Sequence, residues 1–227
     1  MRNRAPVARF EKINNFSITP PGDVTKPIDT GKADVAFKFV FAGNLGRFQQ
    51  LGQLVEGAGN CLGDTSPPIE LHLVGTGTLE TKLRSIVDQK GYSNVFFHSY
   101  RRPEEIGPFL QTFDAGVVSL RPGLLDVAFP SKTFSYWAND LPIFAIVDAD
   151  RELGRMIDET DSGLVCPDND VASIASHMRK LAQTEKKWTG VEDRTRHLWS
   201  PEDTVIQWRN LIARLASDEK SGKQQVS

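Results

Sequence analysis

The sequence predicts an α/β protein with a doubly wound, six-stranded parallel sheet of Rossmann-like form. Short apolar runs rich in β-branched and aromatic residues alternate along the chain with helical patterns. The runs at 115–118 and 143–147 contain no alternating polar residues, as expected of strands buried on both faces. A right-handed crossover helix between them makes the two strands parallel. We therefore expect the strand order 3-2-1-4-5-6.

Composition limits the function classes. The 227 residues, 39% of them hydrophobic, suffice for one substantial domain with appendages. A net charge of −2 and the lack of a basic stripe argue against a nucleic-acid partner. There is no signal-peptide pattern and no run of about 18 apolar residues, so we expect no transmembrane segment and a cytoplasmic location. Cys61 and Cys166 stand far apart and predict neither a disulfide nor a metal site.

The chain divides into four segments. Residues 1–34 resemble a linker or hinge with one edge strand at 7–18, and residues 35–199 form the sheet domain. A closing helix over 200–216 begins with a capping box at Ser200 and Pro201. Residues 217–227 are expected to form a flexible tail. The apolar positions that we expect the closing helix to bury are Val205, Trp208, Ile212 and Leu215.

Glycine-rich turns follow the first two strands. The first strand, at 35–41, leads into Gly43 and Gly46 before a helix over 49–58, and the second, at 69–74, ends at Gly75 and Gly77. Such glycines let a backbone approach a ligand, although they can also serve only to make a tight turn. Glu80 occupies the place of a third glycine, so the dinucleotide-binding fingerprint is absent.

The central unit carries the strongest candidate site. A long loop at 119–130, with Arg121, delivers the chain to a helix that begins at Ser131 and ends at the corner 139–142. The backbone N–H groups, hydroxyls and ammonium of Ser131, Lys132 and Thr133 suit an anion. This predicts a phosphate site; the alternative is an ordinary capped helix with Lys132 in solvent.

Topology favours the phosphate site. In the expected strand order the switch point lies between strands one and four, and ligands bind outside the carboxyl ends of these strands. The loops that meet there are 43–47 and 119–132. The same two loops are the ones whose residues suit an anion.

The rest of the chain completes the sheet. The third strand, at 95–97, runs through Tyr100 and Arg101 to a short helix that begins at Pro103. A helix at 151–159, a strand at 163–166 and a helix at 171–181 follow. The histidines at 72, 98, 177 and 197 share no short spacing, so we expect structural or surface roles. Trp137, Trp199 and Trp208 are expected to pack the core and the closing helix.

The motifs FVFAGNLG, IELHLVGTGTLETKL, NVFFHSY, FDAGVVSL, FPSKTFSYWAND, SGLVCPDND and WSPEDTVIQW stand in this order. From 35 to about 215 the chain resembles the C-terminal lobe of a GT-B glycosyltransferase of the group 1, or family 4, class. It is most similar to the bacterial subset with Pro-Ser-Lys at the central helix, which is associated with surface polysaccharide assembly. The segment at 7–18 resembles the hinge strand between the two lobes.

The resemblance implies a nucleotide-diphosphate sugar as donor substrate, with no cofactor and no metal ion. An acceptor, saccharide or lipid-linked, would be held by an N-terminal lobe or a separately encoded partner, and any attachment to the inner membrane would go through that partner. No catalytic residue can be assigned. The residues expected to bind the donor and its phosphates are Gly43, Asn44, Gly46, Arg47, Arg121, Pro130, Ser131, Lys132 and Thr133. Those expected near the base and ribose are Gly75, Gly77, Tyr100, Arg101 and Ser135.

Four positions depart from the family pattern. Family members carry an E-x7-E pair that holds the donor sugar and the ribose, and these glutamates fall at Val127 and Ser135. The family's Arg and Lys after strand one fall at Asn44 and Gln49, which leaves Arg47 as the nearest cation in that turn. These departures bear directly on donor specificity and on activity.

Two functional classes follow from this sequence. One is the donor-binding half of a hexosyltransferase of polysaccharide biosynthesis. The other is a degenerate, non-catalytic lobe that binds a nucleotide or a partner protein. A third, weaker reading is a flavodoxin-like receiver module, but it needs aspartates where Asn44 and Ser119 stand.

Overall fold

The computed structural model confirms the α/β class and the strand order. It describes residues 13, 36–63, 66–123, 129–184 and 188–224. Six parallel strands form one sheet in the order β3-β2-β1-β4-β5-β6. The predicted segment at 7–18 and the predicted donor-sugar position, Val127, lie outside the described residues, Ile13 excepted.

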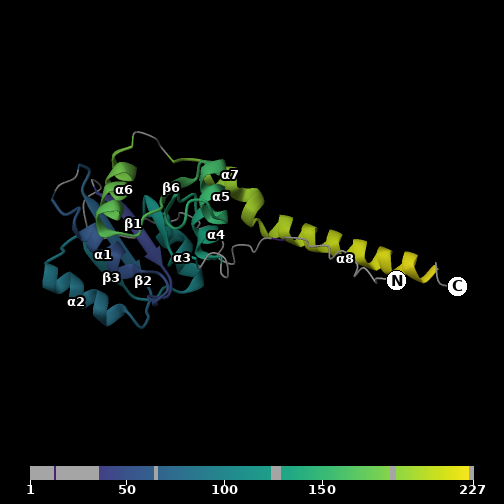
Figure 1. The fold of residues 1–227 in the computed structure, drawn as a ribbon, viewed down its shortest axis with the longest axis horizontal. Helices are drawn as coiled ribbons and strands as arrows, with labels where there is room; N and C mark the ends of the chain where they lie inside the picture. Colours follow the sequence, from purple (N-terminus) through teal and green to yellow (C-terminus); the bar gives the residue numbers. More distant parts are fainter. Residues whose placement is uncertain (1–12, 14–35, 64–65, 124–128, 185–187, 225–227) are drawn as a thin grey trace, which may run out of the picture.

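Strands and helices alternate through the first six units (Figure 1). The strands are β1 (Phe37–Ala42), β2 (Ile69–Val74), β3 (Val95–His98), β4 (Ala115–Ser119), β5 (Ile143–Ile146) and β6 (Gly163–Cys166). The helices are α1 (Leu51–Gly59), α2 (Glu80–Lys90), α3 (Pro103–Leu110), α4 (Lys132–Trp137), α5 (Glu152–Thr160), α6 (Val171–Gln183), α7 (Val191–Trp199) and α8 (Pro201–Gln224).

Each face of the sheet has its own hydrophobic core. One core joins alternate residues of β1, such as Phe39 and Phe41, to α1, α2 and α6. The other joins Val40 on the opposite face of the same strand to α3, α4, α5 and α7. Figure 1 shows these two groups of helices on the two sides of the sheet. The alternation follows from the strand pleat and explains why these strands contain so few exposed positions.

The central helix ends where the sequence predicts. Asp140 takes a left-handed conformation with φ of 56°, and Pro142 follows two residues later. The Asp140 carboxylate accepts hydrogen bonds from the backbone N–H groups of Gly190 and Glu192, at 3.4 and 3.0 Å. Asp140 therefore both closes α4 and connects it to the start of α7.

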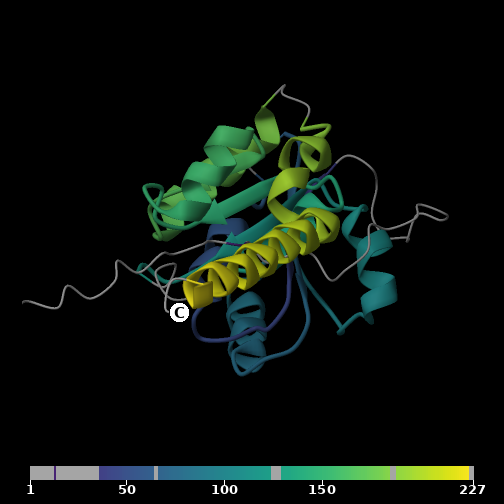
Figure 2. The ribbon, with the colours of Figure 1, turned by 90° about the vertical axis from the view of Figure 1, so that its right-hand side faces the viewer.

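The prediction that the closing helix buries its apolar residues is wrong. Ser200 caps α8, accepting from the Asp203 N–H at 3.2 Å, and Thr204 in the first turn is buried. Beyond that turn the helix extends away from the sheet domain (Figure 1), and in Figure 2 it lies in front of that domain. The side chains that were expected in the core are 44–61% exposed: Val205, Trp208, Ile212 and Leu215. The helix also continues past the expected end at 216, to Gln224.

The sequence interpretation also missed α7. This helix buries Val191, Thr195 and Trp199, which recur at helical spacing on one face. Trp137 and Trp199 are buried in the core as predicted, whereas Trp208 is not. Among the described residues, no helix is both long and apolar enough to cross a membrane.

Candidate functional site

A cleft of about 1080 Å³ opens at the carboxyl ends of β1, β2 and β4. This is the switch point of the sheet, where β1 pairs with both β2 and β4. Its walls come from the turns after β1 and β2, the segment between β3 and α3, and the start of α4. The sequence-predicted residues that line it are Gly43, Asn44, Gly75, Tyr100, Arg101, Pro130, Ser131, Lys132 and Ser135.

Five predicted residues lie outside this lining: Gly46, Arg47, Gly77, Arg121 and Thr133. Gly46 and Thr133 are buried, while Arg47 and Arg121 are exposed. The backbone of Arg121 is tied to the first turn, since its N–H donates to the Phe48 carbonyl at 2.9 Å. The two arginines thus stand on neighbouring loops at the rim rather than in the wall.

The glycines after β1 and β2 hold the two turns together. A Cβ added at Gly75 would lie 2.3 Å from the Gly43 carbonyl oxygen, and one at Gly77 2.4 Å from that of Leu45. The Leu45 N–H donates to Thr76, and its carbonyl accepts from Leu79. Backbone packing therefore requires a glycine at position 77, as expected if Gly77 serves only to make a tight turn. Gly75, with φ of 124°, serves this packing while also facing the cleft.

The start of α4 differs from the expected anion-binding terminus. The helix has only 6 residues, and Ser131 makes no side-chain cap hydrogen bond. The Thr133 N–H donates to the Pro130 carbonyl at 3.1 Å, so it is not available to a ligand. Such a short helix contributes little dipole. The anion-binding capacity of this wall therefore depends on Lys132.

Lys132 does not project into solvent. The residue is half-buried, and its ammonium lies 3.5 Å from the centroid of the Phe41 ring. A Cβ at Gly43 would come within 3.3 Å of the same nitrogen, so this glycine leaves room for the ammonium. Burial lowers the pKa of Lys132 to about 7. The alternative of a solvated lysine is thus wrong: the cleft wall holds a poorly solvated amine.

Tyr136 fixes α4 against β1. Its hydroxyl accepts from the Ala42 N–H at 2.9 Å and donates to the Val40 carbonyl at 3.3 Å. Its ring fits over Gly116, where an added Cβ would lie 2.5 Å from the ring. Burial raises the pKa of the Tyr136 hydroxyl, so it stays protonated. Lys132, one turn earlier, is therefore set at a fixed distance from the end of β1.

The opposite wall carries an arginine and an aromatic ring. Arg101 stacks its guanidinium over Phe109 of α3, 4.7 Å from the ring centroid. Its Nε is buried and makes no hydrogen bond to the described residues. Tyr100, at 67% exposed, presents a large free ring beside it. An exposed aromatic face next to a guanidinium suits a planar base.

Sequence reasoning missed the apolar part of the cleft. Phe48, Ile106, Leu110 and Phe129 all line it, and Phe48 is 57% exposed. A phenylalanine inside a polar turn was the available signal for Phe48. Gln49, which stands at the family's lysine position, lines the cleft too, and its buried Oε1 has no hydrogen-bond partner among the described residues.

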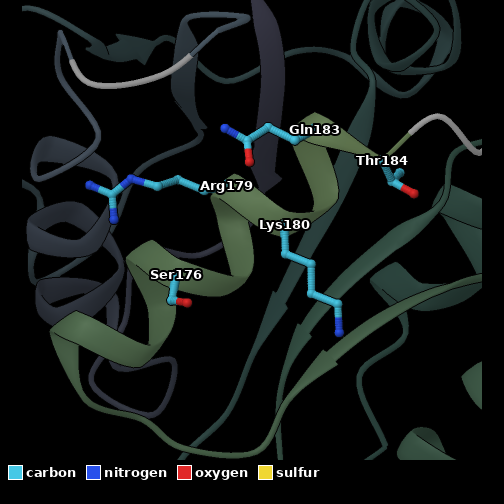
Figure 3. Close-up of a pocket in the computed structure, with 5 residues that line it drawn as sticks. All are labelled: Ser176, Arg179, Lys180, Gln183 and Thr184. Carbon is cyan, nitrogen blue, oxygen red and sulfur yellow. The ribbon is translucent and has the colours of Figure 1, made fainter.

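A second hollow, of about 560 Å³, lies on the outer surface of α6 (Figure 3). Its lining comes from one face of that helix and the residue after it: Ser176, Arg179, Lys180, Gln183 and Thr184. Arg179 is already engaged, because it donates to the Asn60 carbonyl. The hollow shares no lining residue with the cleft. Within the described residues, no group of His, Cys, Asp and Glu could hold a metal ion.

Comparisons with known proteins agree with this geometry. The family model described as "Glycosyl transferases group 1" matches residues 36–184. The chain is 27% identical over 149 residues to the probable glycosyltransferase WbjE of Pseudomonas aeruginosa. This match covers 65% of the chain and 36% of that protein, so the chain spans about a third of its relative's length.

Two examples illustrate the solved structures that share this fold. One is the C-terminal domain of LpcC, a group 1 family glycosyl transferase from Francisella tularensis, with a TM-score of 0.57 and 15% identity over 78% of this chain and 86% of that one. The other is Alr3699/HepE from Anabaena in complex with UDP-glucose, with a TM-score of 0.62 and 15% identity over 80% of this chain and 49% of that one. The chain is a GT-B lobe and belongs to the group 1 glycosyltransferase family.

Proposed function

We propose that the chain is the donor-binding lobe of a glycosyltransferase. It would bind a nucleotide-diphosphate sugar whose hexosyl group passes to a saccharide or lipid-linked acceptor in surface polysaccharide biosynthesis. One observation carries the proposal: the switch-point cleft is bounded on one side by Lys132 and on the other by Tyr100 and Arg101. An amine facing a guanidinium and an aromatic ring suits a ligand with both phosphates and a base.

The proposed orientation follows from the two walls. The diphosphate would lie against Ser131 and Lys132, and the base against Tyr100 and Arg101. Ser135 faces the same cleft and offers a hydroxyl to the ribose. HepE, which shares this fold, was solved with UDP-glucose, and this supports a nucleotide sugar as the ligand. No metal-binding cluster occurs in the described residues, and the proposed binding needs none.

A thermal-shift scan with UDP, GDP, their sugars and CMP tests the proposal. A ligand that binds only the native state raises the melting temperature with its concentration. We expect one nucleoside diphosphate to do so for the natural chain, and Lys132→Ala to reduce the shift. If no nucleotide in the panel shifts the melting temperature at millimolar concentration, these nucleotides and their sugars are excluded as donors.

A second candidate function is binding without turnover. The observation that favours it is the loss of carboxylates, because Ser135 lines the cleft where the family has a glutamate and the sequence has Val127 at the other glutamate position. The cations after β1 are also replaced, by Asn44 and Gln49. One measurement distinguishes the two functions. A nucleotide sugar that binds but is never consumed, even with an acceptor and an added acceptor-binding partner, identifies the degenerate lobe.

A further inference from the structure

A row of hydrogen-bonded side chains crosses β2 and β3 beneath α3. His72 Nε2 lies 3.1 Å from Glu70 Oε2, and His72 Nδ1 lies 2.8 Å from His98 Nε2. Glu70 and His72 are 7% and 1% exposed. The two rings are nearly parallel, at 17°, with centroids 5.1 Å apart. Two histidines that stand 26 positions apart in the sequence are thus joined, the buried His72 to the half-buried His98.

The chemistry of these side chains fixes which atom donates each hydrogen bond in the row. Glu70 lies opposite Lys38 in the register of β1 and β2, and both residues are buried. A carboxylate oxygen accepts, so His72 Nε2 carries a hydrogen and, in the neutral ring, its Nδ1 accepts. His98 Nε2 must then be the donor to His72. The row therefore runs from His98 through His72 to Glu70.

His98 stands where the row reaches the cleft wall. It is the last residue of β3, and its carbonyl accepts from the Gly75 N–H at 3.3 Å. Its ring meets the Phe109 ring edge-on at 5.5 Å between centroids, and Arg101 covers the same phenylalanine at 4.7 Å. Gly75 and Arg101 both line the cleft. His98 thus holds Gly75 through its backbone and contacts Phe109, the ring on which Arg101 stacks.

Electrostatics support a neutral His98 in this arrangement. Burial, and then the nearby Arg101 charge, lower the pKa of His98. The other titratable groups in the row are Glu70 and His72; the charges at the start of α3 are exposed and paired with one another. A neutral ring lets the Arg101 cation stay over Phe109 without repulsion.

We propose that His98 is a positioning residue that holds the Tyr100–Arg101 wall of the cleft through the Glu70–His72–His98 row. The identity of the ligand rests on the proposed function, but the positioning of the wall does not. Loss of the His98 donor would remove the 2.8 Å hydrogen bond to His72 Nδ1 and would free the end of β3 that sets Arg101.

The first experiment needs no ligand. His98→Leu removes the donor, whereas His98→Gln keeps an N–H group at the place of Nε2. In hydrogen exchange followed by NMR, His98→Leu should speed exchange of the Gly75 amide and the Arg101 Nε–H by roughly 2- to 10-fold. His98→Gln should stay near the natural chain. Amides of α6 serve as the distant reference, and an equal acceleration there would mean general destabilisation and would overturn the positioning role.

The second experiment uses UDP as the probe. His98→Leu should weaken UDP binding by roughly 2- to 30-fold, while His98→Gln and the distant His177→Leu should not. UDP should also raise the midpoint of the His98 ring titration, because a bound anion offsets the Arg101 charge, and leave His177 unchanged. UDP binding with an unmoved His98 midpoint and full affinity in His98→Leu would overturn the proposal. Failure of the natural chain to bind UDP would count against a UDP donor only, since the exchange experiment decides the positioning role by itself.

Discussion

The Lys132 ammonium lies 3.5 Å from the centroid of the Phe41 ring, inside the wall of the cleft. A cation over an aromatic face gains some electrostatic energy, but here it also loses hydration. The lowered pKa shows that the loss of hydration dominates. An anion bound beside Lys132 would give the ammonium a favourable partner, so the cleft wall holds an amine that a phosphate can stabilise.

We first predict that Lys132→Ala weakens binding of a nucleoside diphosphate by about 1.5–3 kcal/mol, the usual contribution of a hydrogen bond to a charged group. Isothermal titration calorimetry measures the affinity directly. The binding of the corresponding nucleoside, which has no phosphate, should change little. Unchanged diphosphate affinity in Lys132→Ala would remove this residue from the site.

The pH dependence of binding follows from the same amine. In the free lobe the pKa of Lys132 is about 7, and a neighbouring diphosphate raises it. Below pH 7 the amine is protonated in both states, and no proton is taken up. Above pH 7 binding takes up one proton, so affinity should fall by about tenfold per pH unit.

Calorimetry between pH 6 and 9, in buffers of different ionisation enthalpy, measures both the affinity and the proton uptake. Lys132→Arg is the control, because a guanidinium keeps its proton throughout this range. Its affinity should show a much shallower slope above pH 7. A flat profile for the natural chain would mean that Lys132 does not change its protonation on binding.

Tyr136→Phe tests the attachment of α4 to β1. The substitution leaves the Ala42 N–H without its 2.9 Å partner. We expect a loss of about 1–3 kcal/mol in the free energy of unfolding, as for other part-buried donors left unpaired. Tyr92→Phe is the matched control, since its hydroxyl makes an exposed 3.3 Å bond to Asn60. Urea denaturation compares the two, and equal small losses would show that the Tyr136 hydroxyl contributes little.

Arg47 and Arg121 remain predicted partners of the diphosphate. Both are exposed and stand on facing loops at the rim of the cleft. Exchanging either for glutamine should lower the affinity for UDP more than that for uridine, because only UDP carries the phosphates. High salt should narrow the difference, since exposed charges are screened. Equal losses for both ligands would indicate damage to the fold instead.

The fold was predictable because each strand carries its own signal. Runs such as 115–118 and 143–147 are apolar throughout, and the connection rules then leave a right-handed crossover and one strand order. The predicted switch point between β1 and β4 is correct for the same reason. Helical spacing, by contrast, shows only that α8 has an apolar stripe. It cannot show what that stripe faces, and the structure leaves Trp208 exposed.

The site was predictable in outline but not in its contacts. Topology placed Ser131 and Lys132 beside the turn after β1, and the family resemblance placed Tyr100 near the same site. It could not show that Lys132 lies on Phe41, that Gly77 is fixed by the Leu45 backbone, or that His72 meets His98. Each of these depends on strand register and side-chain direction, which no local pattern encodes.

The last prediction is that the 227-residue chain transfers no sugar by itself. Transfer requires an acceptor held within about 3–3.5 Å of the donor carbon and shielded from water. The described residues build one lobe with a cleft open to solvent, and the chain spans 36% of the length of WbjE. The exposed stripe on α8, including Trp208 and Ile212, cannot form an acceptor site without further protein against it.

Labelled nucleotide sugars, with lipid and saccharide acceptors, test this in three arms. The pure chain should bind the donor and release no labelled product. The chain mixed with the protein encoded next to it is the second arm, and Lys132→Ala in the same mixture is the matched control. Turnover by the pure chain would contradict the prediction. Turnover only in the mixture, reduced by Lys132→Ala, would identify one half of a split enzyme, whereas binding with no turnover in any arm would identify the non-catalytic lobe.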